Sequence, residues 1–310
     1  MGYSATQSRV VYKPKDTYFE EKNFYFISMH LSYSCANCQS EKITKQLGWI
    51  RPFVSHRMFD LSLEKDMVGG KEIFPFLYTN SIYCIECGFI FSQIRPDDVE
   101  MKRYYSGYFL GDYVVTRTKF EPGFAEIAEK FISNEKYVRD RIPQIDDFTS
   151  MVALATKITK VLDYGGNRGD YFPEWSRRAW IKRYVYDISD NEDLNDEVNY
   201  LQSLKGFKFE FVMCMNVLEH VPYPGKIICE ISATQRSGDH LFIAVPCEVE
   251  LDASPSRYPK VFHEHINFFR ERSLNSLIKR NGYTVINFKI FNIDVGWTTE
   301  KTLWMLARKL

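Results

Sequence analysis

The sequence predicts an α/β domain in its second half, preceded by a smaller domain that cysteines organise. From about Thr159 onward, short apolar segments of strand length alternate with segments of helical length. A glycine-rich turn, with Gly165, Gly166 and Gly169, follows the first of these apolar segments. Four of the seven cysteines stand in the first third of the chain as two C-x-x-C pairs. Together these patterns are typical of an α/β fold with an added N-terminal module.

Length and charge set the outer limits of the prediction. A chain of 310 residues is long for one core, so two domains are expected. The 40 basic and 40 acidic side chains cancel, which argues against bulk electrostatic binding of nucleic acid or an anionic membrane. No apolar run approaches the roughly 20 residues of a membrane helix, and there is no signal-peptide pattern. An odd cysteine count without a secretory signal favours a cytoplasmic protein with reduced thiols.

The paired cysteines predict a zinc site. Cys35 and Cys38 form "CANC", and Cys84 and Cys87 form "CIECG". Two such turns can supply four sulfurs at the corners of a tetrahedron, the arrangement of structural zinc, and leave no open position for chemistry. The spacing between the pairs requires an insertion, expected over 43–77, that loops out. Four buried free thiols are the alternative. The other three cysteines, Cys214, Cys229 and Cys247, are expected in the core.

Two helices are expected between the cysteine module and the α/β domain. Residues 95–105 predict a short helix with Pro96 at its start and acidic residues in its first turn. Residues 121–142 predict an amphipathic connecting helix. The expected divisions are therefore a zinc-binding, substrate-contacting domain over 1–120, a helical connection over 121–158, and the α/β domain over 159–310.

The glycine turn is the first candidate ligand site. The strand "KVLDY" reaches Asp163, the glycines follow, and a helix is expected next. Glycine lets the backbone approach a ligand and present amide N–H groups. The next strand, "RYVYD", ends in Asp187, where a carboxylate can meet the hydroxyl pair of a ribose. A solvated aspartate in an acidic loop is the alternative for Asp187.

The remaining strands and helices complete the pattern. The segment "FEFVMCMN" is a strand that runs into "VLEH", a strand-to-helix turn carrying Glu219 and His220. Next come the strand "DHLFIAVP", the helix "ERSLNSLIKRNGY" with Gly282 after its end, and an antiparallel pair of strands, "TVINFKIFN" and "KTLWMLARKL".

The stretch "YPKVFHEHINFF" places His263, Glu264 and His265 among apolar and aromatic residues. A helical zinc-protease motif needs histidines four residues apart, and these are two apart. In an extended segment His263 and His265 share one face and Glu264 points to the other. The residues alone leave open a metal site, a catalytic base and a pair of histidines that satisfy buried polar groups.

These motifs in this order resemble a class I S-adenosylmethionine (SAM)-dependent methyltransferase over 159–310. The matching features are the strand with D-x-G-x-x-x-G, the acidic second strand tip, "VLEH" followed by Pro, a strand ending in Pro, and the terminal strand pair. The resemblance implies a Rossmann-like sheet of seven strands with an antiparallel terminal strand. The region with C-x-x-C, C-x-x-C-G and "RYYSGYF" is similar to the zinc-bearing module of sugar methyltransferases, including C-methyltransferases of nucleotide-linked deoxysugars.

The resemblance also implies roles for particular residues. His265 would be the catalytic base, with Glu264 beside it and His263 as the alternative base, and an imidazole with a pKa of about 6.5 suits that task. Tyr105 and Tyr108 would line the acceptor site. The cofactor-binding residues would be Tyr164, Gly165, Gly166, Asn167, Gly169, Asp187, Ile188, Asn216, Val217, Leu218 and His220. Asn167 replaces the usual central glycine, and asparagine tolerates a left-handed backbone better than most residues.

The implied function is methyl transfer from SAM to a sugar or nucleotide-sugar acceptor, at a hydroxyl or a carbon, in capsule, lipopolysaccharide or nucleotide-sugar biosynthesis. The expected cofactors are SAM and zinc. Three alternatives remain: an NAD-dependent oxidoreductase of the same fold, a zinc-dependent scaffold with a degenerate methyltransferase domain, and a methyltransferase of a non-sugar small molecule.

Overall fold

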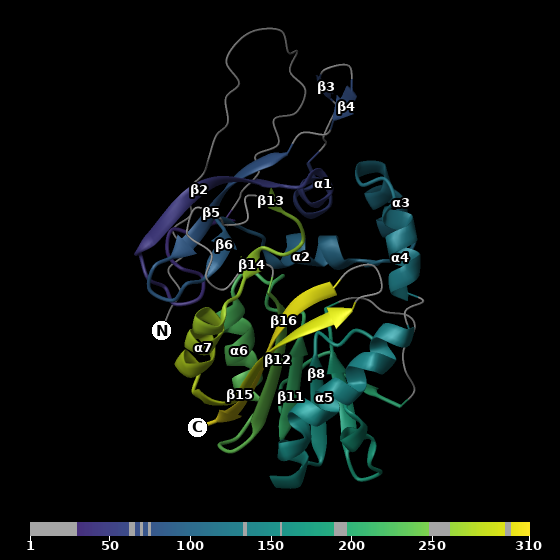
Figure 1. Ribbon diagram of the computed structural model, residues 1–310, viewed down its shortest axis with the longest axis vertical. Coiled ribbons are helices and arrows are strands. Elements are labelled where there is room, and N and C mark those ends of the chain that lie inside the picture. The colour runs from purple at the N-terminus through teal and green to yellow at the C-terminus, as the bar shows by residue number, and fades with distance from the viewer. Residues whose placement is uncertain are drawn as a thin grey trace.

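The computed structural model describes most of the chain (Figure 1). The described residues are 30–61, 66–68, 71–73, 76–132, 135–155, 157–188, 197–247, 261–294 and 299–310.

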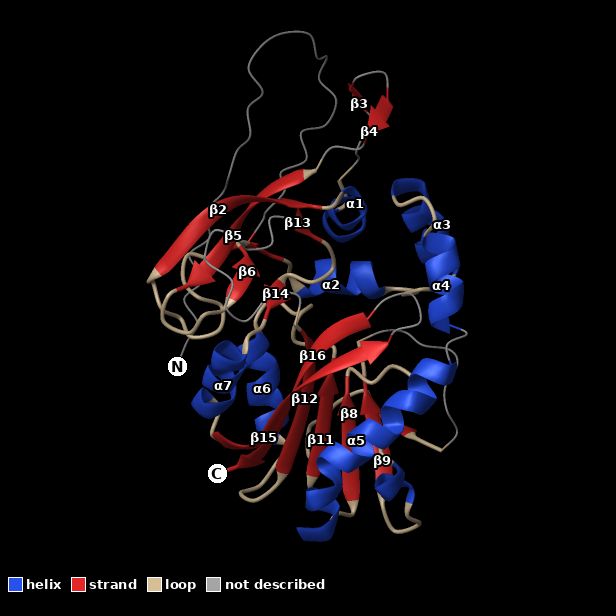
Figure 2. Ribbon diagram, viewed as in Figure 1, coloured by secondary structure: helices blue, strands red, loops and turns tan. Residues whose placement is uncertain are grey.

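A mixed sheet of seven strands forms the centre of the second half, as predicted (Figure 2). One strand, Thr299–Lys309, runs antiparallel to both of its neighbours, and the other six strands all run in the same direction. In spatial order the strands are β10 (Asn199–Tyr200), β9 (Lys182–Tyr186), β8 (Lys160–Tyr164), β11 (Phe211–Met215), β12 (His240–Pro246), β16 (Thr299–Lys309) and β15 (Tyr283–Asp294).

Helices cover both faces of this sheet, which explains why its central strands are continuous apolar runs. Every residue of β11 is buried, as are all but the last of β12. Helix α5 (Glu135–Ala155) packs Phe148 and Val152 against one face, where Trp304 is fully buried. Helices α6 (Pro224–Ala233) and α7 (Glu271–Arg280) pack against the other. The two cores hold the carboxyl ends of β8, β9 and β11 side by side.

A second sheet of five strands lies in the N-terminal region, above the first in Figure 1. Its order is β13 (Val261–Phe262), β2 (Ile43–Ile50), β5 (Leu77–Cys84), β6 (Ile90–Ser92) and β14 (Asn267–Phe268). The two outer strands come from the segment between β12 and α7, far along the chain. The stretch that contains His263 and His265 therefore completes the N-terminal sheet and connects the two halves.

Four helices flank the N-terminal sheet: α1 (Pro52–Phe59), α2 (Asp98–Tyr105), α3 (Gly111–Phe120) and α4 (Phe124–Ile132). They enclose a third core rich in aromatic rings. Helix α2 begins at Asp98 because Asp97 and Glu100 form a reciprocal capping box. The predicted start at Arg95 is too early, since Arg95 ends strand β7 (Ile94–Arg95), which pairs with β1 (His30–Leu31).

The insertion between the cysteine pairs is more ordered than predicted. Strand β2 pairs with β5 along its whole length, from Ile43 opposite Cys84 to Ile50 opposite Leu77. Much of 43–77 is therefore sheet and helix and does not simply loop out. A small hairpin, β3 (Asp66–Val68) with β4 (Lys71–Ile73), projects beyond it.

The prediction of a helix directly after the glycine turn is wrong. Residues 165–173 form turns, and only a single 3₁₀ turn, η1 (Glu174–Arg177), follows. Pro173 precedes that turn, and Trp175 is fixed to α5, where its indole N–H donates to Thr149 Oγ1 at 3.0 Å. The short turn is thus held against α5 by this hydrogen bond.

The connecting helix predicted over 121–142 is also not observed as a single helix. It is observed as α4 and α5, and α5 continues to Ala155 with Pro143 inside it. Gly123 has φ +92°, outside helical geometry, so α4 begins only at Phe124. Within the described part of the chain, none of the helices combines the length and the apolar character needed to cross a membrane.

Candidate active site

The glycine turn closes tightly on its neighbours at the carboxyl edge of the sheet. Gly165 has φ +72°, and its N–H donates to the Tyr186 carbonyl at 2.7 Å. A Cβ on Gly165 would lie 2.4 Å from Val217 Cγ2, so the turn after β8 touches the turn after β11. The positions predicted from β8 and from β11 are thereby brought together.

A hydrogen bond joins Asn167 of the glycine turn to Asp187 at the end of β9. Asn167 adopts φ +50°, the left-handed conformation expected of it. Its N–H donates to Asp187 Oδ2 at 2.8 Å, which orients the carboxylate at the end of β9 beside the glycine turn. Ile188, which follows, is half exposed.

Asp163 is a buried carboxyl that the sequence marked only as the end of a strand. It is 2% exposed, and burial first, then the charges of Asp187 and Asp170, raise its pKa to about 7. Among the described residues, its Oδ2 has no hydrogen-bond partner. A Cβ on Gly166 would lie 2.4 Å from that same oxygen, so position 166 requires glycine. The turn therefore keeps one unpaired acceptor directly under its backbone.

The turn after β11 carries the next group of predicted residues. Asn216 has φ +52°, and its N–H donates to the Ala244 carbonyl at 2.9 Å. Leu218 is fully buried, and the His220 N–H donates to the Val217 carbonyl at 3.0 Å. This compact turn leads the His220 ring toward the 263–265 segment.

Three imidazole rings stand in a row. The ring centroids of His220 and His265 are 4.6 Å apart, and those of His265 and His263 are 4.3 Å apart. His220 Nδ1 lies 3.3 Å from the Glu264 carbonyl, which can only accept, so Nδ1 carries the proton. Burial, then the charge of His265, lower the pKa of His220 to about 3. His220 is therefore neutral near neutral pH.

Glu264 does not face away from both histidines as predicted for an extended segment, because the chain bends at 263–264 and brings its Oε2 to 3.6 Å from His263 Nδ1. Its Oε2 lies 3.3 Å from Arg117 Nη2 of α3 and 3.5 Å from the Tyr104 hydroxyl. Burial opposes ionisation, but the hydrogen bond with His263 and the positive charge of Arg117 outweigh it and hold the Glu264 pKa well below its usual range. A buried ion pair therefore fixes the 263–265 segment. Nothing in the sequence around Arg117 signals this role.

Of the two tyrosines expected at the acceptor site, Tyr105 lies beside His220 and Tyr108 lies behind Tyr105. The Tyr105 ring meets the His220 ring edge to face with centroids 5.7 Å apart, and Tyr105 and Tyr108 are 5.1 Å apart. Burial raises the pKa of both phenols well above 10. In the part of the chain that the structure describes, the Tyr105 hydroxyl is buried without a hydrogen-bond partner. Tyr108 lies deeper in the aromatic cluster, 5.1 Å from Tyr113.

The four paired cysteines converge. The sulfurs of Cys35 and Cys87 are 3.6 Å apart, those of Cys38 and Cys84 are 3.5 Å apart, and all four lie within 4.8 Å of one another. Sulfurs on a tetrahedral zinc stand about 3.8 Å apart, since each Zn–S bond is about 2.3 Å. Asn37 Nδ2 also lies 3.6 Å from the Cys87 sulfur. The donor set fits one zinc ion.

The other three cysteines only partly match the prediction. Cys214 and Cys247 are buried, but Cys229 is exposed. On α6 the buried face carries Ile228 and Ile231, and Cys229 lies on the outer side of the helix.

A second group of metal-ligand types was not predicted. Glu219, His220 and His265 each offer one donor atom, and these atoms lie within 4.8 Å of one another. Glu219 is 1% exposed, and its Oε1 is 3.7 Å from His220 Nε2. One carboxylate and two imidazoles are a donor set that divalent transition metals accept. The same two imidazoles are also placed to move a proton.

The region that holds this geometry matches a known protein family. A model described as a methyltransferase domain matches residues 128–287, more than half of the chain. The chain belongs to this methyltransferase family. It is a SAM-dependent methyltransferase with the predicted α/β fold, which decides against the NAD-dependent oxidoreductase.

Solved structures give distant likenesses. Magnesium protoporphyrin IX methyltransferase from Synechocystis PCC 6803, with bound S-adenosylhomocysteine (SAH), is 14% identical, with coverage of 64% of this chain and 100% of that one and a TM-score of 0.42. The 1,6-didemethyltoxoflavin-N1-methyltransferase from Burkholderia thailandensis is 17% identical, with coverage of 63% and 87% and a TM-score of 0.43. No curated protein matches the chain. None of these comparisons supports the sugar-specific resemblance, and the acceptor stays a prediction.

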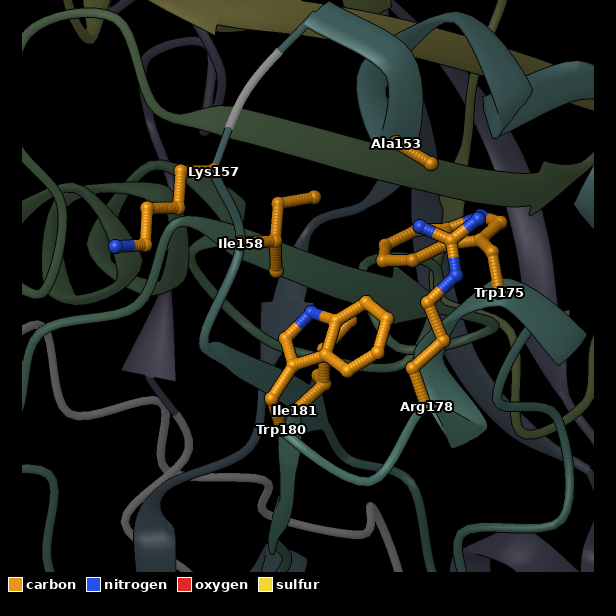
Figure 3. Close-up of a pocket in the computed structure, with 7 residues that line it drawn as sticks. All are labelled: Ala153, Lys157, Ile158, Trp175, Arg178, Trp180 and Ile181. Atoms are coloured by element: carbon orange, nitrogen blue, oxygen red, sulfur yellow. The ribbon is translucent and has the colours of Figure 1, made fainter.

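A surface hollow of the methyltransferase lies away from these residues (Figure 3). It sits where the chain enters β8 and β9, at the amino ends of the strands. None of the predicted site residues lines it. The lining residues are Ala153, Lys157, Ile158, Trp175, Arg178, Trp180 and Ile181.

Proposed function

We propose that the protein transfers a methyl group from SAM to a sugar or nucleotide-linked sugar, with His265 as the general base. The observation that carries this proposal is the arrangement of His220, His265 and His263 in one row, next to a glycine turn that touches the turn after β11 through Val217. A proton acceptor and a cofactor cradle thus share one edge of the sheet.

The cradle residues suit SAM on three grounds. Gly165 and Gly166 carry no side chain, so a ligand can approach the backbone of the turn closely. Asp187, oriented by the Asn167 N–H, offers a carboxylate for ribose hydroxyls. The unpaired Asp163 Oδ2 can accept a hydrogen bond from a ligand ammonium group. When bound, SAM supplies an electrophilic methyl group, so the protein's tasks are alignment and removal of one proton.

His265 is better placed than His263 to remove that proton. His263 Nδ1 lies 3.4 Å from the His265 backbone nitrogen and 3.6 Å from Glu264 Oε2, so it is engaged in either protonation state. In the proposed step the acceptor's O–H or C–H proton moves to the His265 ring as the bond from oxygen or carbon to the methyl group forms. The bond from that methyl group to sulfur breaks, and SAH leaves. The ionised Glu264 at the same segment favours the imidazolium that results.

Tyr105 supports an acceptor that carries hydroxyl groups. A buried phenol without a partner is costly, and a polar ligand beside His220 would satisfy it. The choice of a sugar within that class rests on the similarity of the N-terminal module to sugar methyltransferases. A non-sugar small molecule with a hydroxyl is the second candidate.

We also propose that zinc fills the four-cysteine site and acts only in folding, because four thiolates leave no open position. An odd number of cysteines kept as ligands and thiols suits the reducing cytoplasm, where we place the reaction.

The test is methyl transfer from labelled SAM to a panel of acceptors by the zinc-loaded protein. The panel pairs nucleotide sugars and glycan fragments with phenols and aliphatic alcohols of similar size. We expect label in a sugar. Transfer only to a non-sugar would reject the acceptor class, and calorimetry without any SAM binding would indicate a scaffold with a degenerate domain.

A further inference from the structure

Arg95 is a fully buried arginine of the N-terminal region whose guanidinium bonds only to neutral oxygens within the described residues. Its Nε donates to the Pro222 carbonyl at 2.8 Å, and Nη2 donates to the same carbonyl. Nη2 also donates to Asn267 Oδ1 at 2.7 Å. Nη1 donates to the Ser92 carbonyl at 3.2 Å and reaches the Ile266 carbonyl at 3.5 Å. Most of these acceptors belong to the second half of the chain.

Asn267 extends the same network. Its Nδ2 donates to the carbonyls of Leu218 and Val221, each at 2.7 Å, while its Oδ1 accepts from Arg95. Its backbone N–H donates to the Glu219 carbonyl at 3.0 Å. Asn267 is 1% exposed, and both ends of its amide are used. A single side chain therefore holds the turn that carries His220.

The hydrogen bonds of Arg95 and Asn267 hold the two chain segments that carry His220 and His265. The turn 218–222 contains His220, and residues 266–267 directly follow His265. Arg95 bonds to both segments at once, from β7 of the N-terminal region. The His220 and His265 rings, 4.6 Å apart, have no hydrogen bond to Arg95 or Asn267 themselves.

We infer that Arg95 and Asn267 are positioning residues that set the placement of His265 relative to His220 and so couple the N-terminal region to methyl transfer. This inference rests on the proposed role of His265. A planar guanidinium can serve several carbonyls in fixed directions, whereas a lysine ammonium in its place keeps the charge and loses the fork. Displacement of a reacting group by about 1 Å can cost 10²-fold in rate.

The test uses two conservative variants. Arg95→Lys keeps the charge, and Asn267→Asp keeps the shape but removes the two amide donors to Leu218 and Val221. We expect kcat to fall about 10- to 100-fold in each, while the Kd for SAM stays within about twofold and the zinc content is unchanged. Arg272→Lys is the matched control. Arg272 of α7 also joins the two halves, but it bonds to the Glu86 carbonyl and not to the turn that carries His220 or to residues 266–267, so the kcat of this variant should be normal.

A readout apart from turnover separates positioning from general support. The side-chain NMR resonances of His220 and His265 should shift in Arg95→Lys and Asn267→Asp and not in Arg272→Lys. Normal kcat with unshifted histidine resonances would overturn the inference, as would equal losses of SAM affinity and turnover in all three variants. Should His265→Gln retain full turnover, the proposed function fails, yet the histidine resonances still report whether the two residues position the rings.

Discussion

Gly165 shows how one residue connects the proposed cofactor-binding turn after β8 to the turn after β11 that carries His220. It combines φ +72° with a neighbour, Val217, that would lie 2.4 Å from any added Cβ. Gly206 has a similar φ of +84°, but nothing lies within 4 Å of its Cβ position. A comparison of alanine variants at these two glycines therefore distinguishes the effect of backbone strain from the effect of a steric clash.

We predict that Gly165→Ala and Gly206→Ala both lower the free energy of unfolding, by about 1–3 kcal/mol each from the strained φ. Only Gly165→Ala should also weaken SAM binding, by about tenfold or more, because Val217 and the turn must move. Calorimetric titration of SAM and denaturant unfolding of both variants measure this. Equal SAM affinity in the two variants would remove Gly165 from the cofactor site.

The buried pair of Glu264 and Arg117 predicts a pH dependence of stability. The folded-state pKa of Glu264 lies below its unfolded value, so its contribution is fully present above the unfolded pKa of about 4.3 and is lost as pH falls through the folded pKa. We predict that Glu264→Gln destabilises the protein by about 1–3 kcal/mol at pH 7, and that its deficit relative to wild type shrinks below about pH 4. Urea unfolding at pH 7 and at lower pH tests this, and a deficit that is constant with pH would contradict it.

Sequence could identify residues whose chemistry is local. The convergence of the four paired cysteines follows from their spacing, and the left-handed Asn167 follows from its place in the turn. Arg95, Arg117 and Asn267 could not be found in this way, because each acts on partners more than 40 residues away in sequence. Such contacts exist only once the fold brings the segments together.

At the scale of elements, helix α2 delivers two adjacent tyrosines with different surroundings. The Tyr104 hydroxyl lies 3.2 Å from that of Tyr113 and also contacts Glu264, while the Tyr105 hydroxyl is buried without a partner in the described part of the chain. Adjacent positions on a helix face different directions, so one ring serves the core and the other reaches His220.

This difference predicts opposite results for two matched variants. Tyr105→Phe removes an unsatisfied hydroxyl, so stability should be unchanged or slightly higher, while the acceptor KM rises about three- to tenfold through loss of a hydrogen bond to the acceptor. Tyr104→Phe should lower stability by about 1 kcal/mol and leave the acceptor KM near normal. Thermal unfolding and steady-state kinetics distinguish them, and an unchanged KM in Tyr105→Phe would place the acceptor elsewhere.

The strands and helices were predictable where a periodic apolar pattern was long, as in β11, β12 and the final antiparallel pair. The single 3₁₀ turn in place of a helix after the glycine turn was not predictable, because it depends on the contact of Trp175 with Thr149 of α5, which exists only in the folded chain. The pairing of β13 and β14 with the N-terminal sheet was also beyond the sequence, since two-residue strands carry almost no pattern.

At the scale of the whole molecule, the four-cysteine site and the 263–265 segment, the proposed zinc and catalytic sites, belong to one sheet. Strand β5 ends at Cys84, and β13 and β14, which flank 263–266, form the two edges of the same sheet. Metal-binding energy serves as folding energy in small zinc modules. Loss of zinc should therefore disturb His265 as well as the N-terminal region.

We predict one zinc ion per chain, held by four thiolates. Its removal by a chelator should abolish most turnover while SAM binding at the glycine turn weakens far less. Metal analysis, thiol titration and calorimetry measure the three quantities. A purified protein without zinc and with all seven thiols freely titratable would contradict the assignment.

The most direct test of the account is the comparison of His265→Gln with His263→Gln. His265→Gln should keep the Kd for SAM within about twofold and lower kcat by roughly 10²–10⁴, because proton removal is lost while the cofactor cradle is intact. His263→Gln, in the next ring of the row, should retain most of its turnover. Near-normal turnover in His265→Gln, with or without loss in His263→Gln, would contradict the assignment of His265 as the base.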